Sequence, residues 1–154
     1  MVEYKEKIFI YDGFLNKCFY GTQGETTWTE TVNCMDTSGI KASSIVAVGQ
    51  YIISTGGDIA NQRTDKIYIY DGTKWTELAN KLTSQRRNHC SVATSETTIV
   101  VMGGQGNGSP SRLKTVEEID IDGNSNPLPN YTFSQLLKLK CHQCSDINSD
   151  VLLL

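Results

Sequence analysis

The sequence of 154 residues holds only two histidines, His89 and His142, and therefore offers little for a metal site built on imidazole ligands. No apolar run approaches the roughly eighteen residues that a membrane-spanning helix needs. Residues 1–7 are polar and lack the apolar core of a signal peptide. Apart from the adjacent Arg86 and Arg87 the chain has no basic cluster, and its net charge is −3, which argues against nucleic acid as a partner.

The chain has five cysteines, and we interpret this odd number, in a chain of this length, as the absence of a disulfide framework. The sequences that begin at Asn107 and Asn130 match the N-glycosylation pattern. The missing signal peptide favours a cytoplasmic location, whereas a chain truncated at its N-terminus leaves an extracellular location open. The compartment is therefore unknown from the sequence.

The strongest pattern in the sequence is a repeat with a period of about fifty residues. Trp28 recurs as Trp75, and a glycine pair at 56–57 recurs at 103–104 after the same interval. The pair at 71–72, Asp-Gly, recurs at 122–123. A sequence that repeats in this way builds one supersecondary unit several times over.

Each full unit predicts short antiparallel strands. In the first unit, runs rich in β-branched residues end at glycine or Asp-Gly turns, which predicts strands over 44–48, 51–55, 66–70 and 74–78. A polar loop is expected over 58–65. The second unit predicts strands over 90–94, 98–102 and 116–121, and Tyr131 or Phe133 is expected to replace the missing tryptophan of the fourth strand.

The repeat divides the chain into four parts. Residues 40–83 and 84–139 are predicted to be whole repeats, and 140–154 to be the truncated start of a further one. Residues 1–39 are predicted to be a partial first unit, with 7–13 as its third strand and Trp28 in its fourth. We therefore expect a fragment of a longer protein, in preference to a ring that other copies of the chain complete.

Alternation along the third strands predicts which face is buried, because side chains of a strand point to opposite sides with period two. One face is apolar in every unit. We expect it to pack against a neighbouring unit through Phe9, Tyr11, Tyr68, Tyr70, Ile119 and Ile121.

An apolar strand, a Gly-Gly pair, a strand with tyrosine, a turn and a tryptophan follow one another, and this order resembles the kelch repeat over residues 8–154. The resemblance rests on the repeat-motif residues Trp28, Gly56, Gly57, Tyr70, Trp75, Gly103 and Gly104, together with Arg87, His89 and Ile121. It implies an all-β fold of four-stranded antiparallel blades in a β-propeller. A closed propeller needs about four to eight blades, so an incomplete ring is expected. Each tryptophan N–H is expected to reach a partner at the blade edge.

No pattern in the sequence predicts catalysis. Cys141, His142 and Cys144 lie close together, but a structural zinc site needs a second pair of ligands, and we expect an ordinary strand entry there. The glycine-rich residues 103–108 lack the Lys-Ser/Thr of a phosphate-binding loop, and the chain has no Gly-x-Ser-x-Gly elbow. We predict no enzyme activity, no cofactor and no metal, with an oxidase-like activity as the alternative.

The kelch resemblance implies that loops before the first strand of a blade and after its glycine pair line a binding face. Arg86, Arg87 and His89 lie in such a loop, and two adjacent arginines can pair with an acidic peptide. The alternative is a solvated loop in which Arg87 forms a salt bridge to a neighbouring blade. We predict a protein-interaction module that binds a protein or peptide, and self-association through open blade edges is a further expectation. The propeller of a secreted galactose-oxidase-like or glycan-binding protein is the alternative.

Overall fold

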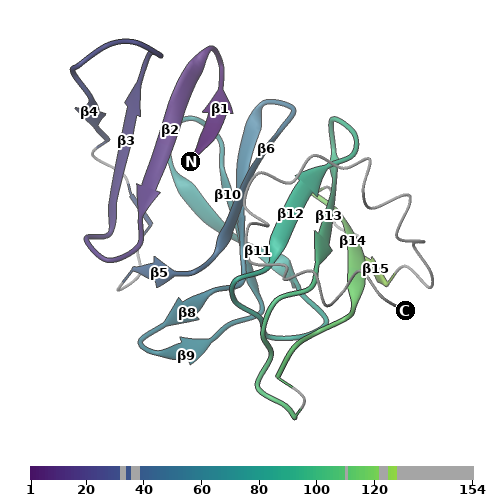
Figure 1. The fold of residues 1–154 in the computed structure, drawn as a ribbon. Coiled ribbons are helices and arrows are strands. Elements are labelled where there is room, and N and C mark those ends of the chain that lie inside the picture. Colours follow the sequence, from purple (N-terminus) through teal and green to yellow (C-terminus); the bar gives the residue numbers. More distant parts are fainter. Residues whose placement is uncertain (32–33, 36–38, 110, 122–124, 128–154) are drawn as a thin grey trace.

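The computed structural model describes residues 1–31, 34–35, 39–109, 111–121 and 125–127. Throughout these residues the regular structure is β, without helices, in four antiparallel sheets that do not close into a ring (Figure 1). None of the described residues form a helix long and apolar enough to cross a membrane. The prediction of an all-β, incomplete arrangement of blades is confirmed.

The second sheet agrees with the predicted first whole repeat. It contains β6 (Ser44–Val48), β7 (Tyr51–Thr55), β10 (Lys66–Tyr70) and β11 (Trp75–Lys81) in the order β11-β10-β7-β6. Gly49, with a φ of 53°, forms the turn between β6 and β7. The carboxylate of Asp71 accepts hydrogen bonds from the backbone N–H groups of Thr73 and Lys74, which fixes the turn into β11.

The third sheet contains β12 (Cys90–Ala93), β13 (Thr98–Met102), β14 (Val116–Asp120) and β15 (Ser125–Pro127), paired in chain order. Its first three strands confirm the predicted ones. The fourth strand was expected near Tyr131 or Phe133, but β15 pairs with β14 earlier in the chain. Tyr131 and Phe133 themselves lie outside the described residues, as do the expected repeat start at 140–154, Asn130 and the cysteine and histidine candidates at 141–144.

The first sheet differs in its strand order from the order expected for residues 1–39. It contains four strands in chain order, β1 (Val2–Tyr4), β2 (Lys7–Asp12), β3 (Lys17–Gly21) and β4 (Thr29–Glu30). The strand β2 is thus second in its sheet, not third. Lys5 and Glu6 both take positive φ, 49° and 61°, and make a two-residue hairpin turn that adds β1 to the sheet.

A fourth, small sheet replaces part of the loop predicted over 58–65. It contains β5 (Ile40–Lys41), β8 (Asp58–Ile59) and β9 (Gln62–Arg63) in the order β5-β8-β9. Ala60 and Asn61 have φ values of 50° and 64° and close a tight hairpin between β8 and β9. This hairpin projects from the lower end of the molecule in Figure 1.

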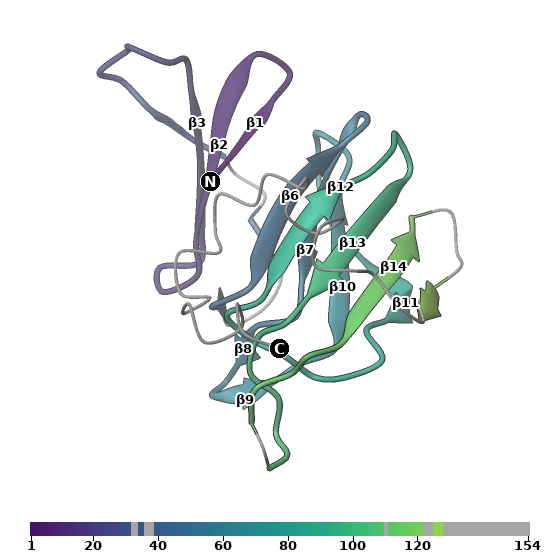
Figure 2. The ribbon, with the colours of Figure 1, turned by 45° about the vertical axis from the view of Figure 1, so that its right-hand side comes forward.

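The three large sheets stand side by side like blades, and we call them the first, second and third blade (Figures 1 and 2). Their first strands, β1, β6 and β12, follow one another, with β6 in contact with both neighbours. The loop between β7 and β10 of the second blade carries β8 and β9 of the small sheet. The loop between β13 and β14 of the third blade extends to the same end of the molecule (Figure 1).

Apolar side chains fill the two spaces between the blades. Phe9 of the first blade lies with its ring centroid 5.5 Å from Tyr70 and 6.1 Å from Trp75 of the second. The second and third blades share a cluster that includes Ile53, Ile67, Val48, Ile99, Val101, Ile119 and Ile121. Each such side chain contributes about 1.5–3 kcal/mol when fully buried, so these clusters hold the blades together.

The prediction that the alternating apolar faces pack between units is confirmed, with one change of direction. Tyr70 faces back toward the first blade, and Ile119 faces back toward the second. Phe9 instead faces forward, onto the second blade.

A disulfide bond joins Cys18 to Cys34, with the two Cα atoms 5.5 Å apart. From the odd number of cysteines we predict no disulfide framework, so this bond is not expected from the sequence. Cys18 lies on the buried face of β3, and the chain after β4 returns to it. Cys90 is disulfide-bonded as well.

Candidate functional site

A polar hollow of about 420 Å³ lies where the β8–β9 hairpin meets two loops of the third blade. One of these loops precedes β12, and the other follows β13. All the lining side chains are polar: Asp58, Asn61, Gln62, Arg63, Gln85, Arg87 and Asn107. The three segments that contribute them are far apart in sequence, and the packing of the second blade on the third brings them together.

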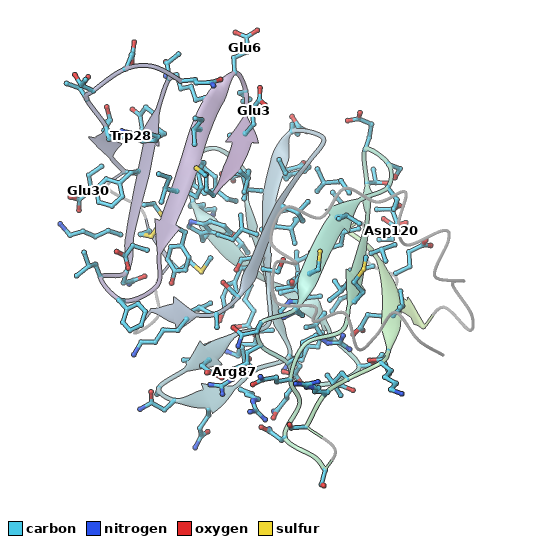
Figure 3. All side chains as sticks on the ribbon, in the orientation of Figure 1. Glu3, Glu6, Trp28, Glu30, Arg87 and Asp120 are labelled. Carbon is cyan, nitrogen blue, oxygen red and sulfur yellow. A yellow bond between two sulfur atoms is a disulfide. The ribbon has the colours of Figure 1, made fainter. Side chains whose placement is uncertain are left out.

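Arg87 is held on one wall of this hollow by bonds to the small sheet and to the loop after β13 (Figure 3). Its Nη1 donates to Oδ2 of Asp58 over 2.7 Å, and its Nε donates to Oε1 of Gln105 over 3.3 Å. The backbone groups of Arg87 and Gln105 also exchange two hydrogen bonds. The side chain stays 38% exposed, so a partner can reach it. The expected alternative, a salt bridge from Arg87 to the neighbouring blade, is present.

Arg63, for which the sequence carries no signal of such a role, forms a second link across the hollow. Its Nη1 donates to the carbonyl oxygen of Gly106 and, over 3.2 Å, to Oδ1 of Asn107. Asn107 in turn donates through its side-chain amide to Oε1 of Gln85. The tip of the loop after β13 is thereby tied to the β8–β9 hairpin.

Asp58 is 8% exposed and lies at the base of the hollow. Its Oδ2 accepts from Arg87, while Oδ1 is buried and has no hydrogen-bond partner among the described residues. Buried carboxylate oxygens are normally satisfied, so Asp58 retains capacity to accept one further hydrogen bond.

Arg86 is completely buried, in contrast to its neighbour Arg87. Its Nη2 lies 2.7 Å from Oε1 of Glu117, and its Nη1 donates to the carbonyl oxygen of Gly103 over 3.0 Å. Burial lowers the pKa of Arg86, and the carboxylate of Glu117 acts in the opposite direction. Arg86 therefore stabilises the third blade and offers no group to a partner.

His89 is also buried, with 5% of its surface exposed. Its Nε2 is hydrogen-bonded to Oγ1 of Thr55 over 2.8 Å, and this hydroxyl lies 2.9 Å from Oγ of Ser91. Burial, and secondarily the charge of Arg86, lowers the pKa of His89 to about 3. The imidazole is thus neutral near pH 7 and lies inside the junction of the second and third blades. Of the three residues predicted to bind a partner, the structure places Arg87 alone on the surface of the hollow.

Comparison with known protein families gives a match of residues 86–125 to the Kelch motif. The matched residues begin at Arg86 and span β12, β13 and β14 of the third blade. A search of curated proteins found no significant match. The predicted resemblance to the kelch repeat is confirmed over these residues.

One glycine of each repeat pair lets the chain pass close to the backbone of the loop that carries Arg86 and Arg87. Gly104 has a φ of 89°, and a Cβ atom there would lie 2.6 Å from the carbonyl oxygen of Arg87. At Gly56, where φ is 54°, a Cβ atom would lie 2.5 Å from the carbonyl oxygen of Arg86. Both positions exclude other residues on conformation and on space.

The two tryptophans of the repeat have different surroundings. Trp75 packs on Tyr70, with ring centroids 5.3 Å apart, and is half-buried. Its Nε1 is buried without a hydrogen-bond partner among the described residues, so the expectation of a partner for this N–H is wrong. Trp28 lies over Gly21 on the outer face of the first blade and is 40% exposed (Figure 3).

Within the described ranges, no group of three or more His, Cys, Asp or Glu side chains is arranged to hold a metal ion. The chemistry that the hollow does offer is hydrogen bonding and charge pairing, from two guanidinium groups, one carboxylate and four amides. Such groups recognise polar and charged ligands.

Proposed function

We propose that this chain is a protein-interaction module whose contact surface is the loop face that surrounds the polar hollow. The observation that carries the proposal is the way in which three separate loops are fixed around an accessible Arg87. The Asp58–Arg87 pair and the bonds from Arg63 to the loop after β13 hold these loops in one arrangement. Binding residues on rigidly held loops lose less conformational entropy when a partner binds.

Affinity capture of the chain with quantitative mass spectrometry tests this proposal. The informative variant replaces Asn61 and Arg87 by alanine, since both line the hollow and neither belongs to the apolar clusters. The matched control replaces Gln50 and Glu96 by alanine. Both residues are exposed and lie in turns at the ends of the strands away from the hollow. A partner lost with the first variant and retained with the control supports the proposal.

Equal capture by both variants would place the contact elsewhere on the molecule. Loss of the partner by both would point to unfolding, which circular dichroism and the thermal midpoint distinguish from a local effect.

A second candidate function is favoured by one observation, the disulfide between Cys18 and Cys34. Disulfides persist mainly in oxidising compartments, which suits the propeller of a secreted glycan-binding protein. The amides and the carboxylate of the hollow are also groups that bind sugar hydroxyls. Binding to a glycan array by the oxidised chain, abolished by the Asn61 and Arg87 variant, would support this candidate over the first.

A further inference from the structure

We propose that the hollow recognises the carboxylate of a single glutamate or aspartate side chain on the partner, held by Arg63 and Arg87. This inference rests on the proposed interaction function and names the group that the loop face selects. Arg63 comes from the small sheet and Arg87 from the loop before β12, and the two segments lie next to one another only in the folded chain.

The hydrogen bonds within the hollow leave part of each guanidinium available. Arg63 uses Nη1 for Gly106 and Asn107, and its Nε–Nη2 edge makes no hydrogen bond to a described residue. Arg87 uses Nη1 and Nε, and its Nη2 is similarly open within the described part of the chain. The free edge of Arg63 has the geometry for two parallel bonds to a carboxylate, and Arg87 can add a third.

The charges of the lining favour one negative charge in the ligand. Two arginines and Asp58 leave the hollow with an excess of one positive charge, although the whole chain carries −3. The carboxylate of Asp58 opposes a second negative charge nearby, which disfavours a phosphate dianion. The single negative charge of a carboxylate balances this excess positive charge, whereas the two negative charges of a phosphoryl group exceed it.

The shape and chemistry of the walls select the end of a side chain, not an apolar anchor. The lining contains no aliphatic or aromatic side chain, and the volume of about 420 Å³ lies at the small end of the range for ligand pockets. The amides of Asn61 and Gln62 can bond the peptide backbone beside the acidic residue. An acidic residue at the tip of a partner loop fits these conditions.

Nuclear magnetic resonance of the arginine side-chain N–H groups tests this assignment directly. The probes are three blocked pentapeptides, Gly-Ser-X-Ser-Gly, in which X is glutamate, glutamine or phosphoserine. We expect the glutamate peptide to shift the Arg63 and Arg87 signals in a saturable way, and the glutamine peptide to bind roughly fivefold more weakly, the upper value for the loss of one exposed ion pair.

Two variants sharpen the test. Arg63→Lys keeps the charge and loses the bidentate edge, so we expect weaker binding of the glutamate peptide without a change in the spectrum of the blades. Asp58→Asn removes the opposing carboxylate, and we expect it to raise the affinity for the phosphoserine peptide relative to the glutamate peptide. Lys81→Gln, on the exposed outer strand of the second blade, is the control and should leave binding unchanged.

Equal binding of the glutamate and glutamine peptides, or tighter binding of phosphoserine to the unmodified chain, would overturn the assignment. So would the absence of any shift at Arg63 and Arg87. If that result occurs while the Asn61 and Arg87 variant still loses its captured partner, the carboxylate assignment fails and the interaction function stands.

Discussion

Arg86 and Glu117 form an ion pair that is sealed from solvent, with Nη2 and Oε1 2.7 Å apart and their side chains 0% and 2% exposed. The pair is extended by bonds from Arg86 to Gly103 and Thr115, and by a bond from the backbone N–H of Thr83 to Glu117. It lies between the loop that carries Arg87 and the strand β14. The accessible arginine of the hollow therefore depends on the buried one beside it.

Breaking this pair is expected to destabilise the chain strongly. Glu117→Gln removes the countercharge of a fully buried guanidinium, so we expect the free energy of unfolding to fall by about 3–5 kcal/mol. The double variant Arg86→Met with Glu117→Leu removes both charges and should cost less than either single change. Urea denaturation of Glu117→Gln, of the single changes Arg86→Met and Glu117→Leu, and of the double variant measures these differences, and additive losses in the last three would show that the two side chains are not coupled.

The neutral state of His89 predicts a loss of stability in acid. Its pKa is lowered to about 3 in the folded chain and is near 6.5 in the unfolded chain, so the unfolded chain binds the proton more readily. The contribution of the neutral imidazole is complete above pH 6.5 and is lost as the pH falls toward 3. Between pH 7.5 and pH 5 we expect a loss of about 2 kcal/mol.

Denaturant titrations of the unmodified chain and of His89→Gln at both pH values measure this contribution. The glutamine variant keeps a hydrogen-bonding side chain near Thr55 but does not titrate, so the difference between its two values should be smaller by about that amount. A pH dependence identical in the two proteins would mean that other groups cause it.

Gly104 and Gly108, two glycines of the loop after β13, supply a matched test of backbone conformation and packing. At Gly104 a Cβ atom would lie 2.6 Å from the carbonyl oxygen of Arg87, with φ at 89°. Gly104→Ala is therefore expected to cost about 1–3 kcal/mol or more. At Gly108, in the same loop, a Cβ atom would meet nothing within 4 Å, and Gly108→Ala should change stability by at most about 0.5 kcal/mol. The thermal midpoints of the two variants measure these changes in stability. An equal fall in the midpoint of both variants would contradict the packing argument.

The second blade could be predicted strand by strand because its turns carry explicit signals. Gly49 and the Asp71-Gly72 pair are residues that tight turns favour, and they bound short apolar runs rich in β-branched residues. The strand β1 had no such signal. It is three residues long, and its turn uses Lys5 and Glu6, which adopt positive φ through the pairing of the strands and not through their own preference.

In the candidate site, too, local sequence signals predicted some residues, and others depend on contacts between distant segments. Arg87 could be found because it lies in a loop at a strand entry, whereas the burial of Arg86 depends on β14. One signal was present in the sequence: Glu117 falls on the apolar face of β14 with Ile119, where a carboxylate needs a buried partner. Arg63 and Asp58 meet the hollow only through the hairpin turn at Ala60 and Asn61, which strand alternation does not encode.

The disulfide between Cys18 and Cys34 is expected to stabilise the first blade. The bond closes a loop with a sequence separation of 16, for which chain entropy predicts about 3 kcal/mol. Reduction, or replacement of both cysteines by alanine, should lower the thermal midpoint and expose Phe9 and Tyr20 of the cluster around Cys18. Thermal unfolding with and without reductant, followed by near-ultraviolet circular dichroism, measures the effect; an unchanged midpoint would show that the bond does not contribute.

The exposed apolar side chains of the first blade are expected to drive self-association. Among the described residues all the exposed large apolar side chains lie in the first thirty positions: Met1, Phe14, Leu15 and Trp28. Trp28 packs over Gly21, which the register pairs with Ile8, so Trp28 lies on the face of the first blade that carries Ile8. The equivalent tryptophan of the second blade, Trp75, is instead covered by Phe9 of the first blade. Exposed apolar surface of this kind associates in water. Light scattering after size exclusion should therefore show a mass that rises with concentration, and Trp28→Ser should reduce that rise, whereas Ala79→Ser on the exposed outer strand of the second blade should not. A monomer at every concentration would contradict this prediction.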